Sequence, residues 1–203
     1  MDLSIIIIGY NTSKELQNCL LSINNQKNIQ ENIEIIYIDD GSIDNSIELF
    51  NSFKSNFPKK CIKHKKNKGR NIARNSGIKN SLGRWCFFIN SNIILKENVI
   101  HNYLNEIKNT TSIAITGNIE YTCKNKKFES YLNNPNRGVN SFKSKKTIPY
   151  YFLLFSNACI KKSTFNENLL DSDFIGYGGS EMEMSFRINQ FMPDSILFIP
   201  NVP

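Results

Sequence analysis

The stretch Ile33-Glu34-Ile35-Ile36-Tyr37-Ile38-Asp39-Asp40-Gly41-Ser42 determines the expected fold. Its closely spaced apolar residues are typical of a strand that is buried on both faces of a parallel sheet. Two carboxylates follow where the strand should end, and the next Gly and Ser favour a sharp turn. Because ligands of open α/β sheets bind at the carboxyl ends of the strands, Asp39 and Asp40 are candidates for reading a polar ligand. The alternative is a strand cap with two solvated acids.

Strands and helices alternate on both sides of this stretch. We expect further strands at residues 3–8, 61–65, 84–89 and 113–117, with helices at 14–25, after Asp44, from Arg70 to about Gly83, and at 96–108. This alternation predicts a doubly wound α/β layer with right-handed crossovers. The first turn contains a single Gly, which falls short of the dinucleotide fingerprint and excludes the usual nicotinamide interpretation.

The second part of the chain has a different character. Residues 121–146 are rich in Lys, Asn and Ser, which predicts an irregular excursion. We expect a strand or strand pair over 150–160, a helix from Glu181 to about Gln190, and a last strand at 196–199. Since no linker or internal repeat separates the parts, one domain should span residues 1–203.

Composition limits the classes of partner and compartment. Hydrophobic residues make up 40% and charged residues 21%, with a formal net charge of +7 that suggests an anionic partner such as a nucleotide, a nucleic acid or a lipid surface. Five scattered cysteines without C-x-x-C spacing argue against a disulfide framework or a zinc site and favour a reducing, cytoplasmic compartment. His64 and His101 are the only histidines, so a multi-His metal site is excluded. No segment has the apolar length of a membrane-spanning helix.

Two further stretches carry candidate chemistry. The basic turn before Arg70 opens a helix at the same sheet edge as Asp39, and Arg70 and Arg74 share one face of that helix. An anion there would also gain from helix N-terminal amides, although these cations could simply be solvated. Farther along, clustered glycines precede Glu181 and Glu183, which open the last helix. Acids in a first turn are also ordinary dipole-matched residues.

Four motifs together carry a family resemblance. They are Ser4-Ile5-Ile6-Ile7-Ile8-Gly9-Tyr10-Asn11; Ile38-Asp39-Asp40-Gly41-Ser42 with Asp44; Lys68-Gly69 through Ala73-Arg74-Asn75-Ser76-Gly77-Ile78 to Gly83; and Gly176-Tyr177-Gly178-Gly179-Ser180-Glu181-Met182-Glu183. In this order and spacing the chain resembles the family 2 glycosyltransferases of GT-A fold, with a galactosyltransferase-like C-terminal segment. The resemblance implies a Rossmann-like three-layer α/β sandwich with a mostly parallel central sheet. It divides the domain into a nucleotide-binding half, residues 1–118, and an acceptor-binding half, residues 119–203.

The resemblance also assigns roles to residues. Glu181 would be the catalytic base, Tyr10 would stack on the nucleotide base, and Asp39 would accept from the uracil edge. Nucleotide-binding residues would be Tyr10, Asp39, Lys68, Arg74, Asn90 and Ser91, and sugar- or acceptor-binding residues would be Asn157, Tyr177, Gly178, Gly179 and Glu183. The partners implied are a nucleotide sugar, expected to be a UDP-sugar, and a glycan acceptor. Peripheral membrane contact is compatible with this interpretation.

One departure from the family pattern affects the expected cofactor. The family carries Asp-x-Asp after the fourth strand, where this chain has Asn90-Ser91-Asn92. An amide keeps an oxygen ligand but loses the charge, so a divalent metal such as Mn²⁺ or Mg²⁺ at Asn92 should be held weakly or not at all. Phosphate charge would then fall to Lys68, Arg70 and Arg74.

The sequence therefore favours an inverting glycosyltransferase of polysaccharide biosynthesis. The main alternative is a catalytically weak or inactive domain of the same fold that serves as a partner or scaffold subunit, which Asn90 and Asn92 suggest. A nucleic-acid-binding domain is disfavoured, because the chain lacks the interleaved aromatic and basic residues that stack on bases.

Overall fold

The computed structural model describes residues 1–165, 169–174 and 179–200 and places them around a single sheet. The strand order is β3-β2-β1-β4-β7-β5-β8-β6. The strands are β1 (Leu3–Gly9), β2 (Ile33–Asp39), β3 (Lys59–Lys63), β4 (Trp85–Asn90), β5 (Ala114–Thr116), β6 (Lys146–Thr147), β7 (Ala158–Lys161) and β8 (Ile196–Phe198). Strands β1 to β4 are parallel, as are β5 and β8, whereas β7 lies antiparallel between β4 and β5 and β6 is antiparallel to β8. The expected mostly parallel sheet is confirmed.

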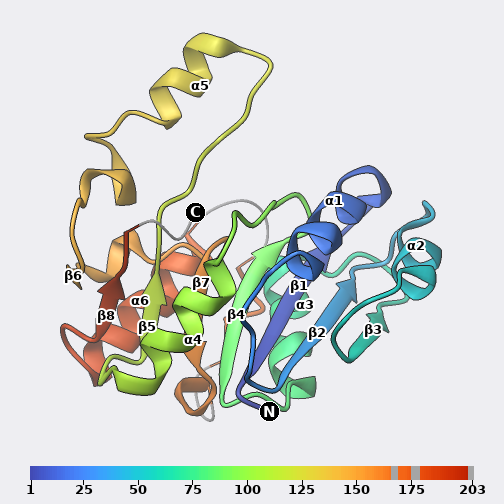
Figure 1. The fold of residues 1–203 in the computed structure, drawn as a ribbon, viewed down its shortest axis with the longest axis horizontal. Coiled ribbons are helices and arrows are strands. Elements are labelled where there is room, and N and C mark those ends of the chain that lie inside the picture. Colours follow the sequence, from blue (N-terminus) through green and yellow to red (C-terminus); the bar gives the residue numbers. More distant parts are fainter. Residues whose placement is uncertain (166–168, 175–178, 201–203) are drawn as a thin grey trace.

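Helices cover both faces of this sheet (Figure 1). One core cluster joins Ile5 and Ile7 of β1 to α1 (Ser13–Asn24), α2 (Ser46–Ser52) and α4 (Val99–Asn109). The other joins Ile6 and Ile8 to α3 (Arg70–Asn80) and α6 (Ser180–Phe191). Because successive strand residues point to opposite faces, β1 is buried on both sides, and the three-layer arrangement follows.

The register of the central strands brings the predicted site residues to one edge. Gly9 of β1 is opposite Asp39 of β2, and Ile8 is opposite Asn90 of β4. The carboxyl ends of these neighbouring strands therefore lie at the same edge of the sheet, and Asp39 and Asn90 flank β1 on its two sides, roughly 10 Å or two strand spacings apart.

The second part of the chain departs from expectation in two places. The strand predicted from residue 150 is wrong in its first part, because residues 150–152 form the short 3-10 helix η2 (Tyr150–Phe152) before β7 begins. The excursion at 121–146 also contains ordered turns, namely α5 (Lys126–Leu132) and the 3-10 helix η1 (Gly138–Ser141). Asn125 caps α5 by accepting from the backbone of Lys127 and Phe128. No residue of α5 is buried, so the sequence carries no apolar periodicity that would reveal it.

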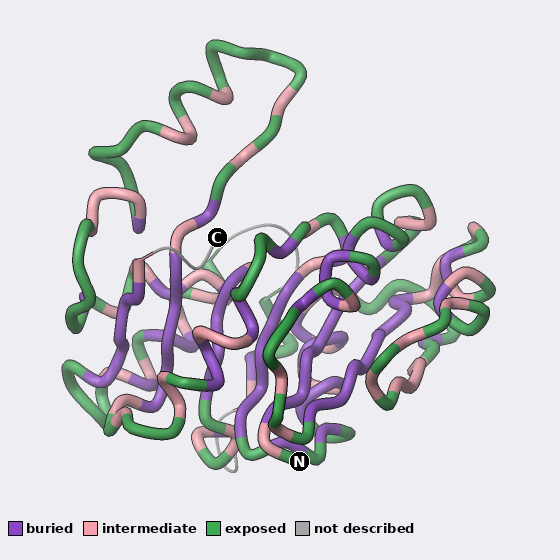
Figure 2. Tube along the Cα trace, in the orientation of Figure 1, coloured by how far each residue is buried: buried purple, intermediate pink, exposed green. Residues whose placement is uncertain are grey.

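The α5 segment projects beyond the body of the molecule, away from the N-terminus (Figure 1). The burial map in Figure 2 shows the strands as buried and this projection as almost wholly exposed or half-buried. A further 3-10 helix, η3 (Lys162–Phe165), follows β7. None of the helices in the described part of the chain is long and apolar enough to cross a membrane.

Candidate functional site

Two loops at the carboxyl edge of the sheet hold each other in place. Asn11, which adopts a left-handed φ of 53°, donates its backbone N–H to Ser42 Oγ at 2.9 Å. Asp44 Oδ2 accepts from the backbone of Ser13 at 2.9 Å, and Asp44 Oδ1 accepts from the backbone of Ser46 at 3.1 Å. Asp44 thereby braces the first turns of both α1 and α2, which explains why an acid follows the Gly-Ser turn in this position.

Asp39, the last residue of β2, lies beneath this loop and not in the open. Its side chain is 0% exposed, and Oδ2 accepts from the backbone N–H of Ser42 at 3.0 Å. The Tyr37 hydroxyl lies 3.5 Å from Asp39 Oδ1, and burial raises the pKa of that phenol to about 12, so it stays protonated as a donor. The structure therefore places Asp39 where it orders the turn, with its carboxylate beneath the cavity wall.

Asp40 is the acid that lines the cavity. Its Oδ1 accepts from the backbone of Lys68 at 3.0 Å and its Oδ2 from the backbone of Gly69 at 2.8 Å. His64 Nδ1 lies 2.7 Å from Asp40 Oδ1, and His64 Nε2 lies 2.9 Å from Ser76 Oγ of α3. This buried chain fixes the loop that leads into α3. Sequence reasoning missed it, because a single histidine gives no signal until the fold shows its partners.

A cavity of about 470 Å³ opens at the ends of β1, β2 and β4. Its lining includes several predicted residues, with Tyr10 half-exposed on one side and Ser91 buried on the other. Asn90 Oδ1 is a buried oxygen that has no hydrogen-bond partner among the described residues. Buried polar atoms are normally paired, so this unsatisfied oxygen is an exception among the residues of the cavity lining. The lining residues are Ile8, Gly9, Tyr10, Asn11, Thr12, Glu15, Asp40, Asn67, Gly69, Arg70, Ala73, Asn90, Ser91 and Asn92.

The predicted cations lie in three different environments. Arg70, the first residue of α3, lines the cavity, whereas Lys68 is exposed and its side chain is not part of the lining. Arg74 is 2% exposed, with its guanidinium 5.2 Å from the Phe155 ring and its Nη2 2.7 Å from Glu181 Oε1. Burial lowers the pKa of Arg74, and the carboxylate of Glu181 opposes that shift. Arg74 thus holds the Glu181 carboxylate through an ion pair, and it is absent from the cavity lining.

Glu181 lies in the first turn of α6, in a recess of about 190 Å³ beside the cavity. Its side chain is 27% exposed, and Oε2 accepts from the backbone of Phe155 at 3.3 Å. Arg70 lines both the recess and the larger cavity, so the two adjoin at this residue. The Glu181 carboxylate is therefore held next to the larger cavity, and Arg70 lies between the two.

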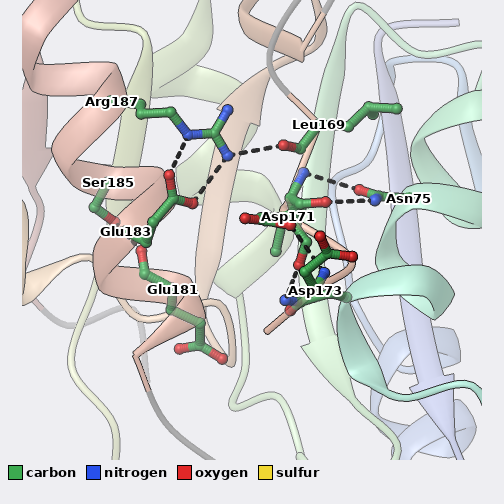
Figure 3. Close-up of polar contacts among 10 residues, drawn as sticks. Asn75, Leu169, Asp171, Asp173, Glu181, Glu183, Ser185 and Arg187 are labelled. Carbon is green, nitrogen blue, oxygen red and sulfur yellow. Dashed lines mark hydrogen bonds and ion pairs between the residues drawn. The ribbon is translucent and has the colours of Figure 1, made fainter. Parts of the chain in front are cut away.

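Glu183 belongs to a separate ion pair. Its carboxylate is 2.5 Å from Arg187 Nε, and Arg187 also donates to the carbonyl of Leu169 at 2.8 Å. Figure 3 shows the Glu181 carboxylate directed away from this pair. Gly179, with φ of 80°, precedes α6 and lines the recess, while Tyr177 and Gly178 fall outside the described residues.

Asn157 is almost fully buried within the fold. Its Oδ1 accepts from the Tyr103 hydroxyl at 2.8 Å, and its Nδ2 donates to the Asn118 carbonyl at 2.8 Å. The side chain therefore ties β7 to α4 and to the end of β5. It is absent from the lining of the cavity and of the Glu181 recess.

The donor groups at the cavity do not fit a tightly held divalent metal. The carboxylates in its lining belong to Glu15 and Asp40, and Asp40 already accepts three hydrogen bonds. Asn90 and Asn92 contribute neutral amides, which bind hard cations more weakly than carboxylates do. Within residues 1–165, 169–174 and 179–200, no group of three or more His, Cys, Asp or Glu side chains could hold a metal ion.

Solved structures with the same architecture define the class of fold as GT-A. A crystal structure of residues 1–349 of Staphylococcus aureus TarS matches 99% of this chain and 58% of that one, with a TM-score of 0.76 at 15% identity. A structure of TarS in complex with UDP-GlcNAc matches equally well, at 14% identity. The GT-A fold expected from the sequence is confirmed.

The family follows from the sequence comparison. The family model for glycosyl transferase family 2 matches residues 4–169, and this chain belongs to that family. Among curated relatives, glycosyltransferase GlyG of Streptococcus pneumoniae is 34% identical over 117 residues, which cover 57% of this chain and 38% of that protein. The uncharacterized glycosyltransferase YfnE of Bacillus subtilis is 30% identical over 117 residues, covering 58% of this chain and 30% of that protein. The chain thus matches about a third of the length of these relatives.

Proposed function

We propose that this chain carries the catalytic centre of an inverting glycosyltransferase that moves a sugar from a UDP-sugar to a glycan acceptor. The observation that carries the proposal is the position of Arg70, which lines both a nucleotide-sized cavity and the recess of Glu181. Solved structures of TarS in complex with UDP-GlcNAc and with UDP support the donor class. A relative named minor teichoic acid biosynthesis protein GgaA, 39% identical over 101 residues, supports a polysaccharide acceptor.

The nucleotide would occupy the cavity at the carboxyl edge of the sheet. The half-exposed ring of Tyr10 offers a face for the base, and the Asp40 carboxylate offers an acceptor for its edge. Asn90 Oδ1, which lacks a hydrogen-bond partner among the described residues, would accept from a ribose hydroxyl. Asp39 would act on the same site indirectly, by holding the turn at Ser42, whose hydroxyl accepts from the backbone of Asn11 in the cavity lining.

The departing diphosphate would be stabilised by Arg70 and by the backbone amides at the start of α3. Negative charge grows on the leaving group in the transition state, so donors already aimed at it lower the barrier. Arg offers a planar fork that matches phosphate oxygens. Since the residues at the cavity do not fit a tightly bound metal, we assign no step of the reaction to a metal ion.

Glu181 would act as the general base. Its carboxylate takes the proton of the acceptor hydroxyl while that oxygen forms its bond to the anomeric carbon. The bond from the anomeric carbon to the diphosphate breaks at the same time, and its electron pair leaves with the diphosphate. Direct displacement inverts the anomeric centre. Arg74 fixes Oε1, so Oε2, whose contact with Phe155 is the longer one, is the oxygen free to turn to the acceptor.

A turnover assay tests this assignment. Purified protein is incubated with a panel of UDP-sugars, in chelator and with Mn²⁺, and released UDP is measured with and without candidate glycan acceptors. The native protein should turn over at least one donor, and Glu181→Gln should slow it by about 10²- to 10⁴-fold. Glu183→Gln is the matched control, since Glu183 lies in the same helix turn but faces Arg187. Equal losses in both variants would remove Glu181 as the base.

The alternative function is a scaffold subunit that lacks catalysis. Asn90 and Asn92, in place of charged metal ligands, are the observation that favours it. Failure of every donor in the panel, together with failure to bind UDP, would support this alternative. We further propose that residues 1–118 hold the nucleotide and that residues 119–203 hold the acceptor.

A further inference from the structure

The chain's positive charge is concentrated in one projecting segment, which we call the basic arm (residues 120–147). It contains seven Lys and Arg side chains against two Glu, and so carries +5 of the formal net charge of +7. The arm includes α5, which extends beyond the sheet (Figure 1), and it ends in β6 at the edge of the sheet; most of the arm is exposed (Figure 2). Glu106, which lies outside the arm, pairs with Lys145 and offsets one of these charges, whereas Lys96, also outside it, pairs with Glu120 of the arm. The remainder faces solvent and creates a local positive potential.

A cavity of about 380 Å³ lies where the arm meets the body of the protein. Aromatic and cationic side chains share its lining: Tyr121 and Arg137 come from the arm, and Tyr151 and Phe152 from η2. Tyr151 is 51% exposed, and the Arg137 guanidinium lies 4.3 Å from the centre of the Tyr131 ring. Exposed rings provide apolar faces for sugar rings, and a guanidinium provides a fork for a carboxylate or phosphate.

This cavity and the catalytic recess are neighbours, because they share lining residues. Tyr151 and Leu154 line both the arm cavity and the recess of Glu181. Arg70 in turn lines both that recess and the nucleotide cavity. An acceptor whose end reaches Glu181 would therefore continue past Tyr151 to the arm.

We propose that the arm cavity binds the acceptor chain and that this acceptor is a polyanionic glycan, a polymer with phosphate or carboxylate groups along its length. The inference rests on the proposed sugar transfer, and it adds the charge class of the acceptor and the surface that selects it. A neutral glycan would gain nothing from the arm's +5 charge. A membrane surface would not require a ring-lined cavity that leads to the catalytic base.

The test measures polymer binding directly, without turnover. Fluorescently labelled poly(glycerol phosphate), polygalacturonate and neutral dextran are titrated with the full chain, and polarisation is recorded at low and high salt. Vesicles of phosphatidylcholine with phosphatidylglycerol are assayed in parallel by cosedimentation. Arg137→Gln is compared with Arg84→Gln, which removes the same charge from an exposed residue beside the N-terminus. A second variant, Lys124→Gln with Lys127→Gln, changes exposed arm residues away from the cavity.

At least one polyanion should bind more tightly than dextran, and added salt should weaken the complex. Arg137→Gln should reduce affinity about tenfold, the equivalent of one charged hydrogen bond, and the double Lys variant should also reduce it. Arg84→Gln should leave it unchanged. Equal binding of dextran, binding of vesicles alone, or equal effects of Arg137→Gln and Arg84→Gln would overturn the inference. If the native protein binds UDP but neither polyanion, this inference fails while the proposed function stands.

Discussion

The buried pair of Arg74 and Glu181 allows the catalytic and structural roles of Glu181 to be separated. Glu181→Gln removes the charge that compensates Arg74, whose side chain is 2% exposed. Breaking a buried ion pair by removing one partner costs about 3–5 kcal/mol. Glu181 itself is 27% exposed, so water can reach the pair and the cost should fall at the lower end, about 3 kcal/mol. A domain with roughly 5–15 kcal/mol of stability would remain folded.

A double-mutant cycle measures this coupling. Urea unfolding is followed by the fluorescence of Trp85, the single tryptophan, which is 7% exposed in the core. Arg74→Met keeps most of the side-chain volume and removes the buried charge. The double variant Arg74→Met with Glu181→Gln should therefore lose about 2 kcal/mol less stability than the two single variants lose together. The double variant should remain inactive. Additive losses, or a cost below about 1 kcal/mol for Glu181→Gln, would refute the description of this pair as buried and coupled.

Three further predictions concern other parts of the molecule. His64→Ala removes a hydrogen-bond partner of the buried Asp40 carboxylate, so the free energy of unfolding in urea should fall by about 1–3 kcal/mol. Calorimetry should show a weaker affinity for UDP. Unchanged values would show that the loop into α3 does not depend on His64. Burial raises the pKa of the Cys19 thiol from 9.0 to about 12, because the folded protein disfavours the thiolate. The stability that this group contributes is therefore fully present below about pH 9 and is lost as the pH rises towards 12. At about pH 10.5 the loss from this group should be about 2 kcal/mol in urea titrations, and Cys19→Ala should show a correspondingly smaller pH dependence. Asn90→Asp with Asn92→Asp should raise the affinity for Mn²⁺ measured by calorimetry, because carboxylates replace amides. An unchanged affinity would show that these two amides are not what keeps metal binding weak.

The sheet and its functional edge could be predicted from the sequence because their signals are local. The apolar run at Ile33–Asp39 and the turn after it fix the strand and its exit. The choice between Asp39 and Asp40 could not be made in this way, because adjacent strand residues face opposite sides and either could line a cavity. The choice depends on His64 and on the backbone of Gly69, which reach Asp40 only through the packing of β3 and α3.

The position of Arg74 shows the same limit more clearly. Its spacing from Arg70 predicts a shared helix face, yet Arg70 lines the cavity while Arg74 is covered by Glu181 of α6. That contact joins residues 107 positions apart in the chain. No local pattern specifies it. The arm helix α5 was missed for a different reason, since a helix without a buried face needs no apolar stripe.

Calorimetric titration of UDP into the native protein in the presence of chelator tests whether Arg70 holds the nucleotide without a metal ion. We expect a single binding site that persists without metal, together with at least a tenfold weaker affinity in Arg70→Ala, because Arg70 lines both the nucleotide cavity and the recess of Glu181. Arg84→Ala, which removes the same charge far from the cavity, should bind UDP as the native protein does. Absence of binding in chelator would show that UDP needs a metal ion, and equal affinity in Arg70→Ala and the native protein would show that Arg70 does not hold the nucleotide.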